Sequence, residues 1–361
     1  VENPNPIAPA FLDACESVGI PAFNDMNGKM MEGEGGAALA NVRIKDGMRR
    51  NIPADYLWET MKRPNITVLT GATVHRLELD GTTLTGVTFE KDGEMMTVGA
   101  NERVIVSAGA INTPKILMLS GIGPSAHLKD AGVAVKHDLP GVGQNFQDHI
   151  LAAGCVWEYK SPLPPKNSAA EATFFWKSDP SLDTPDLQPF QIEVPYVSEV
   201  HGGTYDVPAG TWTIAPGIVR PQSTGEVRLT GANPEDPVTI DGGFLKEEAD
   251  LLALTRCIEL CRDIGNSSPM AEFVKREVMP GALTGDDLKD FARNAAGTYF
   301  HESCTCKMGT DEMSVVDGSL SVYGIEKLSI ADASAMPRVS TGNTMASTVI
   351  IGERMADILI G

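Results

Sequence analysis

The chain has 361 residues, of which 42% are hydrophobic and 21% charged, and its formal net charge is −19. This composition is that of a globular protein with enough apolar side chains for a sizeable core, and the length predicts about two domains. The negative charge disfavours binding to nucleic acid or to anionic membranes, and no apolar run reaches the length of a membrane span.

The first part of the chain predicts two helices separated by irregular segments. Apolar residues recur at helical spacing over residues 7–19, and a second amphipathic helix is predicted over residues 52–62. Residues 33–36 contain three glycines and predict a flexible segment, and residues 66–69 predict a short strand.

Three consecutive segments then predict a β-meander. They cover residues 73–79, 83–90 and 94–98, and the breaks between them are Asp80-Gly81 and Asp92-Gly93. Asp-Gly pairs favour the tight turns that join antiparallel strands. We therefore expect three antiparallel strands in sequence order.

The rest of the chain predicts both parallel and antiparallel strands. Residues 103–107 form an apolar strand that runs into a helix over 113–119, as in a buried parallel layer. Short alternating runs and many prolines over 151–237 predict an antiparallel sheet with long loops. Further elements are expected as helices over 247–264, 285–295 and 345–359 and a strand over 328–331. The fold class is therefore a mixed α/β (α+β) fold.

The glycine-rich motifs do not predict a nucleotide-binding loop. Residues 121–126 match G-x-G-x-x-A in letters, but they follow an apolar helix instead of a strand, and Pro124 lacks the N–H that a phosphate needs. Gly141 and Gly143 flank one residue after Leu139-Pro140 and predict a tight turn. The sequence itself therefore contains no dinucleotide fingerprint.

Six cysteines are sparse for this length and form no disulfide framework. Cys257 and Cys261 lie one helical turn apart and are expected in a core, and Cys304 and Cys306 make a poor metal site because no second cysteine pair is near. These features favour a reducing compartment, and we expect a cytoplasmic protein.

Several long motifs occur in a fixed order. Residues 109–123 read GAINTPKILMLSGIG, residues 139–149 read LPGVGQNFQDH, and residues 299–309 read YFHESCTCKMG. Residues 330–337 and 341–344 read IADASAMP and TGNT. Together these motifs resemble the signatures of the glucose–methanol–choline (GMC) family of flavin-dependent oxidoreductases, and the wording around residue 301 looks closest to choline-dehydrogenase-like members. The resemblance covers essentially the whole chain.

The resemblance implies FAD as cofactor and two discontinuous domains. The FAD-binding domain would comprise residues 36–149 and 300–361, and the substrate-binding domain, an antiparallel sheet flanked by helices, residues 1–35 and 150–299. The family begins with a dinucleotide-binding segment that carries G-x-G-x-x-G, and this segment is absent from the sequence. We therefore expect an N-terminal FAD-binding partner segment, either as a second chain or as a removed piece.

Two residues would perform the chemistry that the resemblance implies. Oxidation of an alcohol needs a base for the hydroxyl proton and a donor for the developing alkoxide, and imidazole suits the first role. The family match assigns these roles to His301 and Asn343. Without the motif, His301 would more simply be a structural histidine. Asn343 also has a second reading, as a cap of the helix that follows it. His301-Glu302 begins like a zinc-binding H-E-x-x-H, but Thr305 replaces the second histidine, so no metal is expected.

The same match assigns further positions to the flavin and the substrate. Val74 would contact adenine through its backbone, Thr344 and Met345 would lie beside the isoalloxazine ring, and Asp332, which is also readable as a cap, would lie near the ribityl and pyrophosphate groups. The full set of expected cofactor residues is Val74, Ser107, Gly109, Asp332, Ala333, Asn343, Thr344 and Met345. Phe300 and Trp176 are expected at the substrate.

The expected reaction is FAD-dependent oxidation of a small alcohol to an aldehyde or ketone, with oxygen or a quinone-like molecule as electron acceptor. Two alternatives remain open at this point. One is a non-redox flavoprotein of the same fold, similar to a hydroxynitrile lyase. The other is a non-catalytic fragment, because the nucleotide-binding loop is missing.

Overall fold

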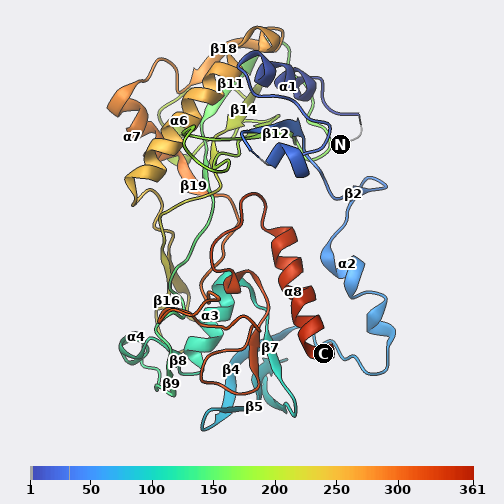
Figure 1. Ribbon diagram of the computed structural model, residues 1–361, viewed down its shortest axis with the longest axis vertical. Helices are drawn as coiled ribbons and strands as arrows, with labels where there is room; N and C mark the ends of the chain where they lie inside the picture. The colour runs from blue at the N-terminus through green and yellow to red at the C-terminus, as the bar shows by residue number, and fades with distance from the viewer. Residues whose placement is uncertain (1–2, 32) are drawn as a thin grey trace.

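The structure is a computed structural model that describes residues 3–31 and 33–361. The described chain forms two bodies, each around its own hydrophobic cluster (Figure 1). The upper body in that view holds the cluster drawn from residues 7–37 and 150–295, and the lower body holds the cluster drawn from residues 77–142, 229 and 306–355. This mixed α/β architecture is the expected fold class.

A six-stranded antiparallel sheet organises the upper body. Its strand order is β1-β12-β13-β14-β11-β18. The strands are β1 (Gly35–Leu39), β12 (Ala170–Trp176), β13 (Phe190–Ile192), β14 (Thr211–Ala215), β11 (Cys155–Tyr159) and β18 (Val274–Met279). A smaller sheet, β15-β10-β19, lies below it and consists of β15 (Gly217–Ile218), β10 (Ile150–Ala152) and β19 (Ala296–Thr298). The predicted antiparallel sheet over 151–237 is present.

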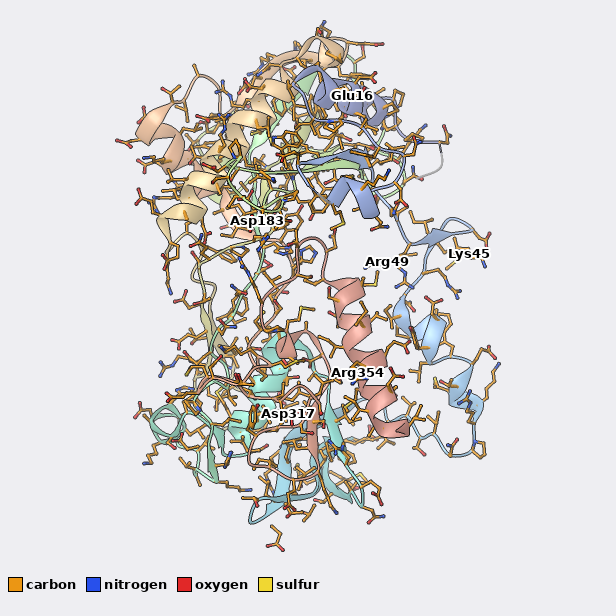
Figure 2. The ribbon with its side chains drawn as sticks, in the orientation of Figure 1. Glu16, Lys45, Arg49, Asp183, Asp317 and Arg354 are labelled. Carbon is orange, nitrogen blue, oxygen red and sulfur yellow. The ribbon has the colours of Figure 1, made fainter. Side chains whose placement is uncertain are left out.

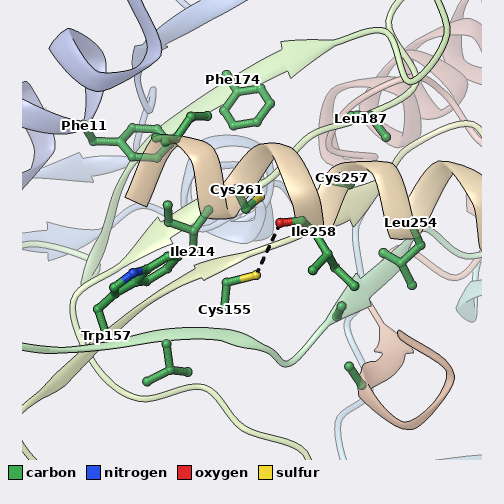
Figure 3. Packing of buried hydrophobic residues seen from close by; sticks show 14 of the residues in the cluster. Phe11, Cys155, Trp157, Phe174, Leu187, Ile214, Leu254, Cys257, Ile258 and Cys261 are labelled. Atoms are coloured by element: carbon green, nitrogen blue, oxygen red, sulfur yellow. Dashed lines mark hydrogen bonds between the residues drawn. The ribbon is translucent and has the colours of Figure 1, made fainter. Parts of the chain in front are cut away.

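Helices α1 (Ile7–Ser17), α6 (Glu248–Gly265) and α7 (Gly285–Ala295) pack around this sheet, and all three were expected from their apolar spacing (Figure 1). The core between α6 and the sheet is fully closed, and Trp157 and Trp212 stack in it with ring centroids 4.7 Å apart. Cys155 donates through Sγ to the carbonyl of Ile258 at 3.9 Å (Figure 3). All six cysteines are free and buried.

The lower body contains the predicted meander and a parallel strand pair. The meander strands are β4 (Ala72–Asp80), β5 (Thr83–Lys91) and β6 (Glu94–Gly99). Strands β7 (Val104–Val106) and β20 (Leu328–Ile330) are parallel, and β7 leads into α3 (Gly109–Leu119). The hairpin β16 (Glu226–Leu229) and β17 (Val238–Asp241) also contacts this body, since Leu229 belongs to its core.

Helix α8 (Met345–Ile360) and the segment 41–71 form the right-hand side of the molecule in Figure 1. The segment carries β2 (Ile44–Lys45), β3 (Met48–Arg49), α2 (Ile52–Tyr56) and the 3-10 helix η2 (Thr60–Lys62). Figure 2 shows Lys45 and Arg49 on this segment, away from the two bodies. It is tied to α8 by the Tyr56 hydroxyl, which donates to Glu353 at 2.6 Å. Among the described residues, no helix combines the length and apolar character needed to cross a bilayer.

The remaining short elements connect these parts. They are η1 (Gly28–Met31), β8 (Ile122–Gly123), α4 (Ser125–Asp130), β9 (His137–Asp138), α5 (Glu199–Gly202), η3 (Ser268–Met270) and η4 (Ala333–Ala335).

Three local predictions need correction. Residues 33–36 are not simply flexible, because Gly35 and Gly36 begin β1; a Cβ on Gly35 would lie 2.0 Å from the Phe175 carbonyl oxygen. The glycines are thus explained by a close strand approach. The predicted strand at residues 66–69 is wrong, and this mostly exposed segment has no regular structure. The helix predicted over residues 52–62 is divided into α2 and η2.

The expected domain boundaries stay a prediction. Strand β1 crosses the expected boundary at residue 36, and the β16–β17 hairpin, which was assigned to the substrate domain, contacts the lower core.

Candidate active site

The two bodies meet where the chain before β10 runs beside the chain after β19. Antiparallel pairing continues past β10 and β19, since the Tyr299 amide donates to the His149 carbonyl at 3.1 Å, and Gln147 and Ser303 exchange two backbone hydrogen bonds. The motif that ends at His149 and the motif that contains His301 are therefore neighbours in space. This long-range pairing brings together two motifs that lie 152 residues apart.

Between these backbone hydrogen bonds, Asp148 holds the segment after β19 that contains His301. The Asp148 carboxylate accepts the His301 backbone N–H at 3.0 Å and the Thr298 hydroxyl. Phe300 has a positive φ of 62°, and its N–H is bound by Thr298 Oγ1 at 2.8 Å. Burial raises the pKa of Asp148 to about 6, against the hydrogen bonds that favour its charged form. Asp148 thus fixes the backbone of His301.

The imidazole of His301 lies between Tyr299, His149 and Asn343. The Tyr299 ring stacks on it at 5.0 Å, and the Tyr299 hydroxyl donates to the Gln188 carbonyl at 2.7 Å. His301 Nδ1 lies 2.9 Å from His149 Nδ1, and His301 Nε2 lies 3.2 Å from Asn343 Nδ2. Burial lowers the pKa of His301 to about 4, so the ring is neutral at neutral pH.

His149 is fully buried behind His301. Its Nε2 lies 2.8 Å from the Ser340 carbonyl oxygen. Burial, with the neighbouring His301, lowers the pKa of His149 to about 3, and hydrogen bonding to the backbone of Ser340 and Val219 only partly opposes this shift. The sequence placed His149 in a motif but gave it no role.

Asn343 comes from the loop that precedes α8. Gly342 has a φ of 89°, and a Cβ there would lie 3.1 Å from Met31 and 3.3 Å from Phe175. The Asn343 side chain does not cap α8, whose N-cap is Thr344. It contacts His301 and receives a hydrogen bond from Gln188 Nε2 at 3.1 Å. The structure therefore brings the predicted pair His301 and Asn343 together.

The expected cofactor residues of the lower body lie on several elements, and two pairs of them lie at one end of the parallel strands. Ser107 and Gly109 follow β7, and Asp332 and Ala333 follow β20, so both pairs lie at the carboxyl ends of parallel strands, where α/β proteins bind nucleotides. Val74 lies on β4 and is 36% exposed, and Met345 begins α8 and is 45% exposed.

The carboxylate of Asp332 is fully occupied by protein donors. Oδ2 accepts from Gly109 N at 2.9 Å and from Thr113 Oγ1 at 2.5 Å, and Oδ1 accepts from the amide and hydroxyl of Ser334. Asp332 therefore caps η4, which was its second reading, and joins it to the start of α3. Any contact of Asp332 with a cofactor would use its backbone.

The residues around this edge fit a flavin dinucleotide. No side chain caps the first turn of α8, so its N–H groups face outward beside Asn343 and favour a negatively charged ring. Apolar side chains of this part of the chain also stay exposed, at Val74, Ile105, Phe300 and Met345.

The two expected substrate residues occupy different surroundings. Phe300 is 72% exposed next to His301. Trp176 is half-buried at the end of β12 and packs against the upper core, whereas its neighbour Phe175 points to Gly342, beside Asn343. The alternation of side chains along a strand puts these two rings on opposite faces.

Sequence reasoning missed Gln188, Tyr299 and Asp148. Asp148 and Tyr299 stand inside the quoted motifs next to the two histidines, so their position was a usable signal. Gln188 lies in no motif, and only the folded chain shows its contact with Asn343.

Comparisons with known proteins identify the family of the chain. Two family models, both described as GMC oxidoreductase, match residues 1–151 and 221–352. Human mitochondrial choline dehydrogenase is 33% identical over 99% of this chain and 64% of its own length. The alcohol dehydrogenase [acceptor] of Pseudomonas putida is 34% identical over 99% of this chain and 68% of its own.

Solved structures give the same picture. Pyridoxine 4-oxidase from Mesorbium loti has a TM-score of 0.93 at 31% identity, over 99% of this chain and 70% of its own. Formate oxidase, with a TM-score of 0.86 at 24% identity over 97% of this chain and 69% of its own, supports the fold alone.

The chain thus spans about two thirds of the length of its relatives, 64% in the human enzyme. The expected separate second chain finds no support in these comparisons, which align 99% of the present chain to single proteins. On the matched family models and the relatives above 30% identity, the chain belongs to the GMC oxidoreductase family.

Proposed function

We propose that this protein oxidises a small alcohol to an aldehyde or ketone with FAD as cofactor. The observation that carries the proposal is the 3.2 Å approach of His301 Nε2 to Asn343 Nδ2 at the edge that fits the flavin. The relatives support the reaction class, since their names include choline dehydrogenase, alcohol dehydrogenase [acceptor] and pyridoxine 4-oxidase. Oxygen or a quinone-like molecule would accept the electrons.

His301 is the base in this proposal. Because burial lowers its pKa to about 4, the ring is neutral near pH 7 and holds a free lone pair for the hydroxyl proton. Asn343 Nδ2 carries two hydrogens, so it can bind His301 and also donate to the substrate oxygen as negative charge develops there. Bound FAD supplies the acceptor for the hydride that leaves the carbinol carbon.

The surroundings of this pair would position the substrate. Phe175 and Met31 lie beside Gly342 and form an apolar wall next to Asn343. Phe300 lies beside His301 and leaves its ring exposed toward the open edge. With FAD and substrate bound over them, these groups would reduce the contact of the reacting oxygen with water and strengthen the hydrogen bonds made to it.

Replacement of His301 tests the proposal directly. In the FAD-loaded enzyme without oxygen, His301→Ala should slow reduction of the flavin by an alcohol about 10²- to 10⁴-fold, the usual contribution of a general base. FAD content should stay unchanged. His137→Ala is the matched control, because His137 lies on β9, an element that carries no residue of the candidate site, and its imidazole contacts the Tyr323 carbonyl. Unchanged reduction in His301→Ala refutes the assignment.

The same experiment separates the alternatives. A non-redox lyase would leave the flavin oxidised when an alcohol is added without oxygen, and a non-catalytic fragment would retain no flavin. No feature of residues 3–31 and 33–361 favours either alternative over alcohol oxidation.

A further inference from the structure

A chain of hydrogen bonds runs through the candidate site from Gln188 to the backbone of Ser340. Gln188 Nε2 contacts Asn343 Oδ1 at 3.1 Å, Asn343 Nδ2 contacts His301 Nε2 at 3.2 Å, and the two Nδ1 atoms of His301 and His149 are 2.9 Å apart. The last contact joins His149 Nε2 to the Ser340 carbonyl oxygen at 2.8 Å. These hydrogen bonds connect the segment before β13, which contains Gln188, with the paired segments of His149 and His301 and with the loop before α8.

The Ser340 carbonyl sets the direction of this chain. A carbonyl oxygen only accepts hydrogen bonds, so His149 Nε2 must carry a hydrogen. His149 is 0% exposed, and burial disfavours a second proton on its ring. His149 Nδ1 is therefore a lone pair, and the hydrogen between the two histidines belongs to His301 Nδ1.

The remaining orientations follow from this step. His301 is neutral with its hydrogen on Nδ1, so its Nε2 is a lone pair. That lone pair needs a donor, which places the Asn343 amide nitrogen toward His301 and the Asn343 oxygen toward Gln188. Gln188 must then present its nitrogen. One backbone carbonyl thus fixes the hydrogens of four side chains.

We propose that His149 is a positioning residue that holds His301 in the Nδ1–H tautomer and leaves Nε2 unprotonated as the atom that takes the substrate proton. This inference deepens the proposed function and rests on His301 being its base. His149 does not pass the proton on, because its outer nitrogen is already protonated and faces a carbonyl that cannot accept a proton. After His301 gains a proton at Nε2, its Nδ1–H still donates to the neutral His149 and the imidazolium keeps its orientation.

Two substitutions divide the contacts of His149. His149→Asn keeps an oxygen near the Nδ1 position that accepts from His301, and His149→Gln keeps a donor near the Nε2 position for Ser340 but no acceptor for His301. In the FAD-loaded enzyme, flavin reduction by an alcohol without oxygen should slow less than about tenfold in His149→Asn and about 100-fold in His149→Gln, because a base in the wrong tautomer is inactive.

The tautomer itself provides a readout that does not depend on activity. In the enzyme labelled with ¹⁵N-histidine, NMR should show His301 with a protonated Nδ1 and an unprotonated Nε2. That signature should persist in His149→Asn and become a mixture in His149→Gln, with His301→Ala used to assign the signals.

The outcomes separate the two proposals. Protonated Nε2 on His301 in the unsubstituted enzyme, or equal rates and equal spectra in the Asn and Gln variants, would overturn the role of His149. Full activity in His301→Ala would overturn the proposed function instead, whatever the NMR spectra show. If neither variant of His149 changes the rate while the tautomer shifts, the tautomer does not limit the reaction and the inference fails.

Discussion

The upper and lower bodies differ in how completely they bury their apolar side chains. The upper body encloses Trp157, Trp212, Phe11 and Phe174, each less than 2% exposed. In the lower body all six residues of β6 are exposed, and so are Val74 and Ile105. The upper body thus completes its own core, whereas the lower body leaves apolar side chains exposed on its strands.

This difference explains the place of the candidate site. The buried sheet provides rigid supports, since Gln188 and His149 belong to segments beside the upper sheets. The groups that face the open edge, Asn343 and Met345, come from a loop and a helix start. A rigid shell behind exposed reactive groups is what precise catalysis requires.

The largest effect is expected from a substitution in the core of the upper body. Trp157→Ala removes a fully buried ring that stacks on Trp212, and we expect the free energy of unfolding to fall by about 3–5 kcal/mol. Hydrogen exchange should speed up over β11, β14 and α6 and stay unchanged over β4 and β5. Met95→Ala on the exposed β6 is the control and should have little effect. Equal loosening of both bodies would show that their cores are not separate.

A second test uses acid, which acts on the supports of the site. Burial holds His301 neutral in the folded protein by lowering its pKa from 6.5 to about 4, while the unfolded chain binds the proton from pH 6.5 downward. The stability contribution is therefore present above pH 6.5 and is lost as pH falls through 4. For His301 alone this loss is on the order of 3 kcal/mol.

Neighbouring groups modify this dependence. His149 acts in the same direction, since its pKa is lowered to about 3. Asp148 acts in the opposite direction, because its pKa is raised from 3.8 to about 6 and its contribution is lost as pH rises through 6. Urea unfolding at pH 7 and at pH 4.5 should show a smaller fall in the free energy of unfolding for His301→Gln than for the unsubstituted protein. An equal drop would mean that His301 is not held neutral.

The next effect concerns the lower body. Asp332→Asn keeps the shape but loses the charge that binds four donors, and it turns one acceptor atom into a donor that faces Thr113 or Ser334. We expect a loss of about 2 kcal/mol and weaker FAD binding, measured by unfolding and by flavin fluorescence. Asp317→Asn is the control, because Asp317 accepts the backbone N–H groups of Ser319 and Ser321 in a turn away from the site. If both variants bind FAD equally well, Asp332 does not shape the edge.

Local signals explain which parts of the fold could be predicted. The meander was predictable because Asp80-Gly81 and Asp92-Gly93 are turn pairs between alternating runs, and α6 because its apolar spacing is regular. Strand β1 was not predictable, because Gly35 is required by the close approach of the Phe175 carbonyl, which lies about 140 residues away in the sequence. Residues 66–69 have strand-forming side chains but no partner strand.

The candidate site shows the same limit. The motifs supplied His301 and Asn343, and the structure places them in contact. The orientation of the pair depends on Ser340 and Gln188, which act through a backbone carbonyl and a single amide. A sequence pattern does not indicate that a serine carbonyl or a glutamine amide will make such a hydrogen bond, so only the folded structure reveals these two contacts.

The smallest expected effect compares two ion pairs. Lys62 and Glu59 pair at 2.8 Å on the outlying segment, with side chains 71% and 83% exposed, so water and salt screen the pair. Lys62→Ala should change the free energy of unfolding by less than about 0.5 kcal/mol.

In the upper body, Glu277 accepts from Arg262, Asn266 and the Gly281 amide while only 14% of its side chain is exposed. Glu277→Gln should cost about 2 kcal/mol, because three donors lose a charged acceptor that is itself largely shielded from water. Urea denaturation at low and high salt distinguishes the two, since salt should erase the small Lys62 effect and leave the Glu277 effect. A Lys62 effect as large as that of Glu277 would mean that the outlying segment is held more firmly than its exposure indicates.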